Sequence, residues 1–322
     1  MHMVKKPHAR RPESDRKKEA VEIAESQDEL TSLPTAASGE LRMTRRSFLK
    51  KGAIAAIGMA LLTGGYASVW EPHRLEVIRL SLSFPELPTS FDGMRVVQFS
   101  DVHLGFFTND DHIHNMAEAI RQLQPDLLCF TGDIVDDYAD SMQDYLPVLA
   151  AMEAPLGKYA VLGNHDYRGI PEGVQALYKH TGFRLLKNEH EILERHGEQL
   201  AIVGLEDLLL SEPDLPRAMA GIPAAMFKLL LMHAPDFADQ AAAAGIHLQL
   251  SGHSHGGQIR VPFLGALKTP PGGRKYVQGL YSVGERKMPV YVNRGIGMTQ
   301  LPVRVLCPPE LTVLTLRRGQ DL

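Results

Sequence analysis

Seven Asp, Asn and His side chains in this 322-residue sequence have the donor atoms of a metal site. They are Asp101, His103, Asp133, Asn164, His233, His253 and His255. A mixed set of nitrogen and oxygen donors suits Mn²⁺, Fe²⁺, Zn²⁺ or Co²⁺ better than Ca²⁺ or Mg²⁺. One zinc ion uses at most about four protein ligands. Seven candidates, with Asp133 able to bridge, therefore predict two divalent metal ions per chain, with Mn, Zn and Fe open as their identity.

Two metal ions about 3.5–4 Å apart can hold a hydroxide between them and bind the oxygens of a phosphate. Metal binding lowers the pKa of water from 15.7 toward about 7, which supplies a nucleophile at neutral pH. The hydroxide attacks phosphorus directly, so no protein nucleophile is needed. His165, next to Asn164, is the candidate catalytic residue, placed to protonate the leaving group or to stabilise the equatorial oxygens. Asp166 either orients His165 or is a loop residue hydrogen-bonded to the backbone.

The candidate ligands share one position relative to the predicted strands. Each lies just past the C-terminal end of an apolar run, and these runs are residues 94–99, 127–130, 159–162, 229–232 and 247–250. In open α/β sheets this edge is where binding sites form. Five motifs that occur in order, each after a strand, argue against a chance arrangement.

Further elements complete an alternation of strands and helices. One helix begins with Asp110 or Asp111 as its cap and ends before Pro125. The other expected elements are strands at 75–84 and 200–204, helices at about 141–152 and after Pro171, and a strand- and turn-rich region from Gln258. Since no internal repeat follows residue 70, residues 70–322 are predicted to form one catalytic domain.

The other histidines and the cysteines provide a comparison. His112 and His114 have an i, i+2 spacing that points them apart on a helix. Others in the body are His180, His190 and His196 in polar segments and His247 at the start of a strand. Each of these is predicted to be on the surface or hydrogen-bonded. Cys129 and Cys307 are predicted to be unpaired core thiols and not a disulfide.

The N-terminal region has the features of an export signal. Residues 1–43 form a polar, charged extension that is predicted to be disordered or loosely helical. Residues 44–69 contain Arg45-Arg46, then Phe48, Leu49 and Lys50, and an uncharged apolar run, which is the twin-arginine pattern. An ordinary membrane anchor is the alternative, because the weak cleavage site at residues 65–67 allows the segment to stay attached. Met43 is a candidate for the true start in place of Met1.

Composition and charge narrow the class of partner. The chain is 44% hydrophobic and 22% charged, as expected of a globular protein. The net charge is −4, and the basic excess lies before residue 68, so the body is acidic. No nucleic acid is expected as a partner, because nucleic-acid binding requires clustered Lys and Arg.

The sequence resembles the calcineurin-like metallophosphoesterase superfamily. The motifs that carry the resemblance are Asp101-x-His103, Gly132-Asp133, Gly163-Asn164-His165-Asp166, His233 and Gly252-His253-Ser254-His255. The resemblance implies an α/β fold with two packed mixed β-sheets flanked by helices, a four-layer αββα sandwich. It also implies the ligand roles: Asp101, His103 and His255 for the first metal, Asn164, His233 and His253 for the second, Asp133 as the bridge, and His165 as the catalytic histidine.

The C-terminal part resembles one bacterial branch of this superfamily, whose members are exported by the twin-arginine route or associated with membranes. The matching stretches are Gly256-Gly257-Gln258-Ile259, Asn293-Arg294-Gly295-Ile296-Gly297, Pro302-Val303-Arg304 and Cys307-Pro308-Pro309-Glu310. The resemblance implies an envelope phosphodiesterase with relatives that act on lipid-linked sugar nucleotides. The relatives that split UDP-diacylglucosamine have Arg where this chain has His165, so the substrate stays open.

We therefore expect a metal-dependent phosphodiesterase or pyrophosphatase of the cell envelope that acts through a metal-bridging hydroxide. The alternatives are a phosphomonoesterase with the same site and a non-catalytic metal-binding protein, and the presence of His165 argues against the second. The expected partners are a phosphorylated small-molecule or lipid-linked substrate, the twin-arginine export machinery, and a membrane through residues 52–69. The expected location is the periplasm, the cell wall or the outer face of the cytoplasmic membrane.

Six side chains are candidates for substrate contacts. Phe106 and Phe107 either face an apolar leaving group or pack in the core. The basic candidates for further phosphates are Arg168, Arg274, Lys275 and Arg294. Of these, Arg294 is expected to lower the KM for an anionic substrate.

Overall fold

The computed structural model describes residues 44–319, so the predictions for residues 1–43 lie outside the described residues. The chain divides after Gly58 into an N-terminal unit and a body. Helix α2 (Arg45–Gly65) continues through a π-turn (Tyr66–Trp70) and a 3-10 turn (Glu71–His73). Within the described residues, this Arg45–His73 segment, which contains an 18-residue window with a mean hydropathy of 1.5, is the one helix long and apolar enough to cross a membrane. A signal sequence has the same properties.

The first sheet of the body joins distant parts of the chain. Its strands are, in spatial order, β1 (Glu76–Phe84), β14 (Glu310–Arg318), β2 (Met94–Phe99), β3 (Leu127–Phe130), β4 (Lys158–Ala160) and β5 (Arg184–Leu185). Strand β14 runs parallel to β1 and antiparallel to β2, and β2 to β5 run parallel to one another. The carboxyl ends of β2, β3 and β4 therefore meet at one edge.

The second sheet has a parallel centre and an antiparallel pair at each edge. Its strands are, in spatial order, β12 (Gly279–Val283), β13 (Met288–Val292), β9 (Leu248–Ser251), β8 (Lys228–Leu231), β7 (Glu198–Gly204) and β6 (Glu189–Arg195). Strands β13, β9, β8 and β7 are parallel, and the two outer pairs are antiparallel. A small hairpin of β10 (Arg260–Val261) and β11 (Gly265–Ala266) stands apart from both sheets.

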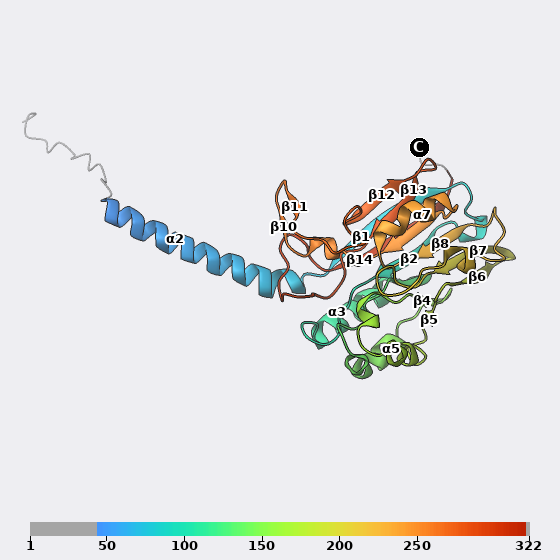
Figure 1. The fold of residues 1–322 in the computed structure, drawn as a ribbon, viewed down its shortest axis with the longest axis horizontal. Coiled ribbons are helices and arrows are strands. Elements are labelled where there is room, and N and C mark those ends of the chain that lie inside the picture. The colour runs from blue at the N-terminus through green and yellow to red at the C-terminus, as the bar shows by residue number, and fades with distance from the viewer. Residues whose placement is uncertain (1–43, 320–322) are drawn as a thin grey trace, which may run out of the picture. The chain divides into compact units, whose positions relative to one another are not determined.

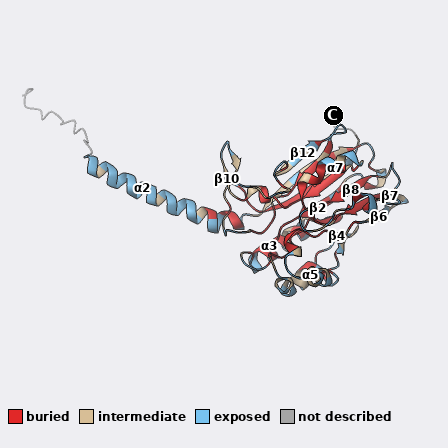
Figure 2. Cartoon of the chain, viewed as in Figure 1, coloured by how far each residue is buried: buried red, intermediate tan, exposed pale blue. Residues whose placement is uncertain are grey.

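Alternation along the strands sorts the side chains into layers. In β2, Met94 and Val96 pack between the two sheets, against residues such as Leu229 of β8. Val97 and Phe99 point to the opposite face of the first sheet. Successive strand residues face opposite sides, and here both sides are covered, so the strands read as continuous apolar runs. Figure 2 shows the buried residues gathered in these strands.

Helices cover the two outer faces. Those on the first sheet are α3 (Asp110–Leu123), α4 (Leu146–Ala150) and α5 (Pro171–Tyr178), and those on the second are α6 (Leu215–Ala218) and α7 (Ala238–Ala243). In Figure 1, α3 and α5 lie on one side of the paired sheets and α7 on the other. The predicted fold class is confirmed: the chain has two multistranded mixed sheets flanked by helices.

Local boundaries differ from the sequence prediction at three points. Helix α3 is capped by Asn109, whose side chain accepts from the backbone N–H of His112, and not by Asp110 or Asp111. The helix expected over 141–152 is a 3-10 helix (Ala139–Tyr145) followed by the short α4, because Pro147 sets a new helix start. The strand expected over 159–162 pairs only over Lys158–Ala160.

The two sheets are also joined by a polar contact beside the ligand-bearing edge. The buried Gln98 of β2 donates from Nε2 to the carbonyl of Ser251 in β9 at 2.9 Å and to Thr131 Oγ1 at 3.1 Å. Because Ser251 immediately precedes the turn that carries His253, this contact fixes the register of one ligand-bearing edge against the other.

Candidate metal centre

All seven predicted ligands converge where the carboxyl ends of the two sheets meet. Asp101 and His103 follow β2, Asp133 follows β3, and Asn164 lies four residues beyond β4. The ligands from the second sheet are His233 after β8 and His253 and His255 after β9. All seven are buried, none more than 8% exposed. The fold thus buries, in one place, polar groups that follow five different strands. A bound charged or polar ligand would compensate the cost of burying them.

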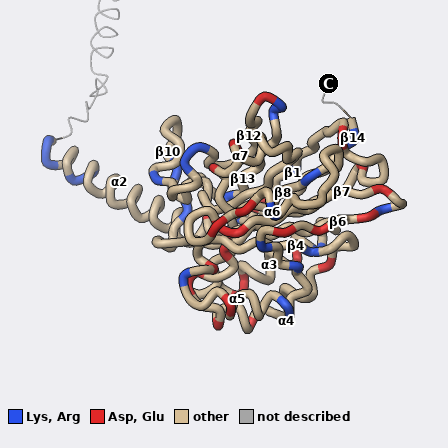
Figure 3. Tube along the Cα trace, turned by 45° about the vertical axis from the view of Figure 1, so that its right-hand side comes forward, with Lys and Arg blue, Asp and Glu red and all other residues tan. Residues whose placement is uncertain are grey.

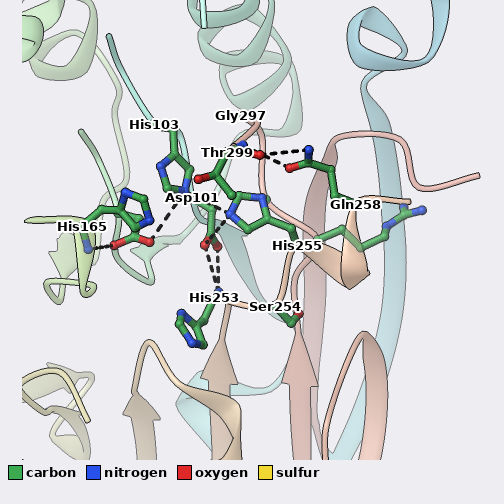
Figure 4. A network of polar contacts seen from close by, with 12 residues as sticks. Asp101, His103, His165, His253, Ser254, His255, Gln258, Gly297 and Thr299 are labelled. Carbon is green, nitrogen blue, oxygen red and sulfur yellow. Dashed lines mark hydrogen bonds and ion pairs between the residues drawn. The ribbon is translucent and has the colours of Figure 1, made fainter. Parts of the chain in front are cut away.

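A first group consists of Asp101, His103 and His255, each with one ligand atom within 4.8 Å of the others. His103 Nε2 lies 3.0 Å from His255 Nε2, which lies 3.4 Å from Asp101 Oδ1 (Figure 4). The other nitrogen of His103, Nδ1, lies 3.1 Å from the carboxylate of Asp136. This contact places the proton of a neutral His103 on Nδ1, so that Nε2 presents a lone pair to the group.

A second group consists of Asp133, His233 and His253. His233 Nδ1 lies 2.7 Å from the carbonyl of Thr131, and His253 Nε2 lies 2.7 Å from the carbonyl of Pro271. Carbonyls only accept, so both of these nitrogens carry protons. In the neutral rings, His233 Nε2 and His253 Nδ1 then face each other with lone pairs, 3.2 Å apart. A cation between them turns this repulsion into coordination.

Asp133 lies between the two groups. Its Oδ2 is 3.1 Å from His233 Nε2 and 3.6 Å from His103 Nε2. Its Oδ1 accepts from the backbone N–H of His165 at 2.8 Å, which fixes the carboxylate. One carboxylate within reach of both groups is the geometry required of a bridging ligand.

The side-chain oxygen of Asn164 completes the donor set. Asn164 Oδ1 is buried and accepts no hydrogen bond from the described residues. A buried carbonyl oxygen without a donor is costly, and an amide oxygen is a suitable ligand for a divalent cation. The donor set therefore fits divalent metal ions.

The electrostatics of the site also favour the binding of metal ions. Burial lowers the pKa of His253 to about 4, and burial together with His103 lowers the pKa of His255 well below its usual value. Both rings are therefore neutral and have lone pairs to donate at neutral pH. Burial also disfavours a charged His233, but the adjacent Asp133 carboxylate raises its pKa to about 10. Without a metal ion, a proton on His233 compensates that carboxylate.

The backbone at the ligands is held in an uncommon conformation. Five of the seven have φ between 50° and 70°: Asp101, His103, Asp133, His253 and His255. Non-glycine residues in this left-handed region cost on the order of 1–3 kcal/mol each and cluster at functional sites. This backbone conformation turns each of these side chains away from the strand direction and toward the centre of the cluster.

Glycines next to the ligands allow the segments to approach closely. A Cβ on Gly252 would lie 1.9 Å from Ser100 Oγ and 2.2 Å from Asp101 Oδ2, and one on Gly163 would lie 2.2 Å from Asp133 Oδ1. His253 N–H donates to both carboxylate oxygens of Asp101 at 3.0 Å across this gap. Glycine at these positions is thus required by the distance between the strands and not by φ.

The candidate catalytic residue is held by a partner that the sequence reasoning did not identify. His165 Nδ1 lies 3.0 Å from Asp136 Oδ1 and 2.7 Å from the Asp136 carbonyl. Burial would lower the pKa of His165, but Asp136 and Asp133 raise it above its usual value. The available signal was the position of Asp136, three residues after Asp133 in the same loop.

Of the two roles predicted for Asp166, the structure shows that of a loop residue hydrogen-bonded to the backbone. It is buried and accepts from the backbone N–H groups of Gly163, Asp133 and Ile134, each at 2.9 Å. It therefore ties the loop that carries Asp133 to the loop that carries His165. It does not contact the His165 ring.

A cavity of about 450 Å³ opens onto the ligands. His165 and Asn164 line it, together with Arg168 and Arg274. Of the other predicted contacts, Lys275 pairs with Asp239, while Arg294 pairs with Glu76 and Glu310 and does not line the cavity. The expectation for Arg294 is therefore wrong in its geometry, because a partly buried salt-bridge network with Glu76 and Glu310 holds its guanidinium. Phe106 is 67% exposed and, like Phe107, is absent from the lining.

The predictions for the two cysteines, His190 and His247 agree with the geometry, whereas His112 differs. Cys129 and Cys307 are both buried and unpaired. His190 Nδ1 contacts the Ala218 carbonyl and His247 Nδ1 accepts from the Lys228 N–H, so both are hydrogen-bonded. His112 is more buried than a surface residue and packs against the ring of His73, with ring centroids 4.4 Å apart.

Comparison with known proteins gives consistent matches. Residues 94–257 match the family described as calcineurin-like phosphoesterase. The chain is 40% identical over 285 residues to an uncharacterized metallophosphoesterase of Bacillus subtilis, YkuE, covering 86% of this chain and 98% of that protein. It is 30% identical to the phosphodiesterase YaeI of Escherichia coli, covering 85% and 99% of the two chains. It is 28% identical to the UDP-2,3-diacylglucosamine pyrophosphatase LpxG of Chlamydia trachomatis, covering 79% and 93%.

The close approach at Gly252 generates a prediction about metal affinity. Gly252→Ala should push Ser100 and Asp101 away from the turn that carries His253 and weaken metal binding at least about 10-fold, the lower end of losses seen when metal-supporting residues are disturbed. Titration of the metal-free protein with Mn²⁺ by calorimetry checks this. The control is Gly64→Ala, where an added Cβ meets no atom within 4 Å. Unchanged affinity in Gly252→Ala would contradict the role given to this contact.

Proposed function

The chain belongs to the calcineurin-like phosphoesterase family, and from this premise we propose that it is a phosphodiesterase or pyrophosphatase that works with two divalent metal ions. The family and relatives named phosphodiesterase and pyrophosphatase make it a metal-dependent phosphoester hydrolase. That the chain binds two ions, and not one, is our proposal beyond the family assignment. The observation that carries it is that Asp133 lies within reach of ring nitrogens on both sides, His103 of one group and His233 of the other, with a further possible group of His103, Asp133 and His165 overlapping them.

In this proposal the first ion is held by Asp101, His103 and His255 and the second by Asn164, His233 and His253, with Asp133 shared. Divalent ions, when bound, supply Lewis-acid stabilisation of the phosphoryl oxygens and a water of lowered pKa. Mn, Zn and Fe all suit this mixture of imidazole, carboxylate and amide donors. The protein contributes the fixed positions of the donors, through the left-handed backbone and the contacts behind the rings.

His165 is the proposed general acid for the leaving group. Its ring lines the cavity, and Asp136 contacts its Nδ1, so Nε2 is the atom that remains for the substrate. Asp136 and Asp133 raise the pKa of the His165 ring above its usual value, which favours the protonated form. A protonated imidazole can both stabilise the charge that builds up on the phosphoryl group and donate a proton to the departing oxygen.

The cavity lining supports an ester with a second substituent on phosphorus. Arg168 and Arg274 add positive charge beyond the metal ligands, and Ile259, Leu267 and Leu301 add apolar surface. A basic and apolar lining fits a phosphodiester or diphosphate with an apolar group better than inorganic phosphate. The names of YaeI and LpxG fit the same class of substrate.

The proposed location is the cell envelope, after export by the twin-arginine route. The support comes from Arg45-Arg46 at the start of the apolar helix α2. The proposed organisation is an extension of residues 1–43, a signal and anchor at 44–69, and the catalytic domain at 70–322. Two contacts favour a retained anchor: the Ala67 carbonyl accepts from the Arg304 N–H at 2.9 Å, and the buried Glu71 accepts from the Cys307 N–H at 2.8 Å.

The first test is hydrolysis of bis-(p-nitrophenyl) phosphate against p-nitrophenyl phosphate. The full chain, stripped by a chelator, should be inactive, and activity should return with two equivalents of Mn²⁺ or Zn²⁺ and favour the diester. Preference for the monoester would contradict the proposal in favour of a phosphomonoesterase. Two bound ions without turnover of either compound would favour a non-catalytic metal-binding protein.

Substitution of the general acid should separate chemistry from metal binding. His165→Ala should lower kcat about 10²- to 10⁴-fold, the usual contribution of a general acid. The metal content, measured by elemental analysis, should stay that of the wild type, because His165 is outside the proposed ligand set. Loss of metal together with activity would instead make His165 a ligand.

The contact with Asp136 predicts a change in the pH dependence. Because Asp136 raises the pKa of His165, activity should fall as the pH rises through that raised pKa and deprotonates the ring. Asp136→Asn should lower the pKa of His165 and move this alkaline limb of kcat/KM to lower pH. An alkaline limb that stays in place, with the metal content unchanged, would show that the two residues are not coupled.

A further inference from the structure

The hairpin of β10 and β11 has a composition that its own fold does not explain. Leu264 N–H donates to the Val261 carbonyl at 3.2 Å, which closes a turn with Pro262 and Phe263 in the middle. Phe263 has a φ of 67°, as at the third position of a type II turn, where Gly or Asn is normal. Phe263 is also fully exposed and Leu264 is 78% exposed. A bulky aromatic residue in a strained and fully exposed position favours a binding partner outside the described part of the chain.

The neighbouring segments of the body carry further exposed apolar side chains. We define the apolar rim as Trp70, Phe263, Leu264, Leu267, Leu301 and Leu306, each at least 50% exposed. Ile259, at the base of the hairpin, forms a bridge with Val305. Residue 304 in turn donates its N–H to Ala67, so the hairpin, the 301–306 loop and the end of the apolar segment adjoin one another.

The rim continues from the segment that is apolar enough to cross a membrane. Trp70 belongs to the Arg45–His73 segment, and the 3-10 turn at Glu71 is attached to the body. At the base of the hairpin, Arg260 and the exposed Lys268 provide positive charge, and Figure 3 shows basic residues beside β10. Apolar tips with basic residues behind them match the interface of a bilayer that contains anionic lipid.

We propose that the apolar rim is a membrane-docking surface, with Phe263 and Leu264 inserted among the acyl chains of an anionic bilayer. The cavity opens at this surface, because Leu267, Lys268 and Leu301 line it. The docked protein then presents its cavity at the level of the lipid headgroups. On the basis of the proposed phosphodiesterase function, the substrates within reach are amphiphiles whose phosphate lies at that level. Docking itself does not depend on that function.

A single-tryptophan reporter tests the docking, because the chain contains only Trp70. The full chain with Trp70→Phe and Phe263→Trp is reconstituted into vesicles of phosphatidylglycerol and phosphatidylcholine with brominated acyl chains. The emission of the reporter at position 263 should shift to the blue and lose most of its intensity through bromine quenching. Both effects should weaken when phosphatidylglycerol is replaced by phosphatidylcholine.

The matched control places the reporter on the β6–β7 hairpin, which lies at the opposite end of the body in Figure 1. The exposed Gln199 is the position, as Trp70→Phe with Gln199→Trp, and it should show neither shift nor quenching. Adding Leu264→Asp to the position-263 reporter should abolish the quenching and leave hydrolysis of bis-(p-nitrophenyl) phosphate unchanged. Activity of the soluble diester thus reports on the proposed function separately from docking.

Three results would overturn the proposal. Equal quenching at positions 263 and 199 would show non-specific adsorption. No quenching at position 263 in the phosphatidylglycerol vesicles would exclude insertion of the hairpin. A blue shift that appears without lipid and grows with protein concentration would assign the surface to a second copy of the chain.

Discussion

The central constraint on this structure is the convergence of buried lone pairs. Asp101 and Asp133, both at most 1% exposed, share a small volume with ring nitrogens that face one another. Such a cluster is stable only if positive charge compensates it, either protons or metal ions. The left-handed backbone at five ligands and the close glycine contacts are the cost of building the cluster. The packed core between the two sheets holds these segments in place.

The cluster depends on two sheets, and the contacts between the sheets are correspondingly specific. Gln98 joins β2 to the residue before the His253 turn. At the other side of Asp101, the loop at Gly297 donates to the Asp101 carbonyl at 2.7 Å. Fully buried Arg304 donates to the carbonyls of Gly295 and Gly297 and so positions that loop. The same stretch of chain contacts the end of the apolar segment at Ala67, which links that segment to the predicted metal ligands.

Much of the site could be predicted because it depends on local sequence patterns. Every predicted ligand follows an apolar strand, and the carboxyl ends of parallel strands meet at one edge, so the grouping of the ligands within each sheet could be predicted. The meeting of the two sheet edges could not, because it depends on tertiary contacts such as that of Gln98 with Ser251. The partners within the site did require it. The contact of His165 with Asp136 and the capture of Arg294 by Glu76 and Glu310 both join segments whose proximity depends on loop paths or sheet order. For the same reason, charge alone suggested Arg294 as a substrate contact, although its guanidinium is already paired.

The position of β14 has a consequence for biosynthesis. This strand lies between β1 and β2, although more than two hundred residues separate Phe99 at the end of β2 from Glu310. The first sheet therefore cannot be completed until residues 310–318 have been synthesised and have left the ribosome. The twin-arginine pair at residues 45–46 emerges long before that moment, while the sheet is still open. Completion of the first sheet is thus a late event of translation, whereas the strands of the second sheet have all been synthesised before β14.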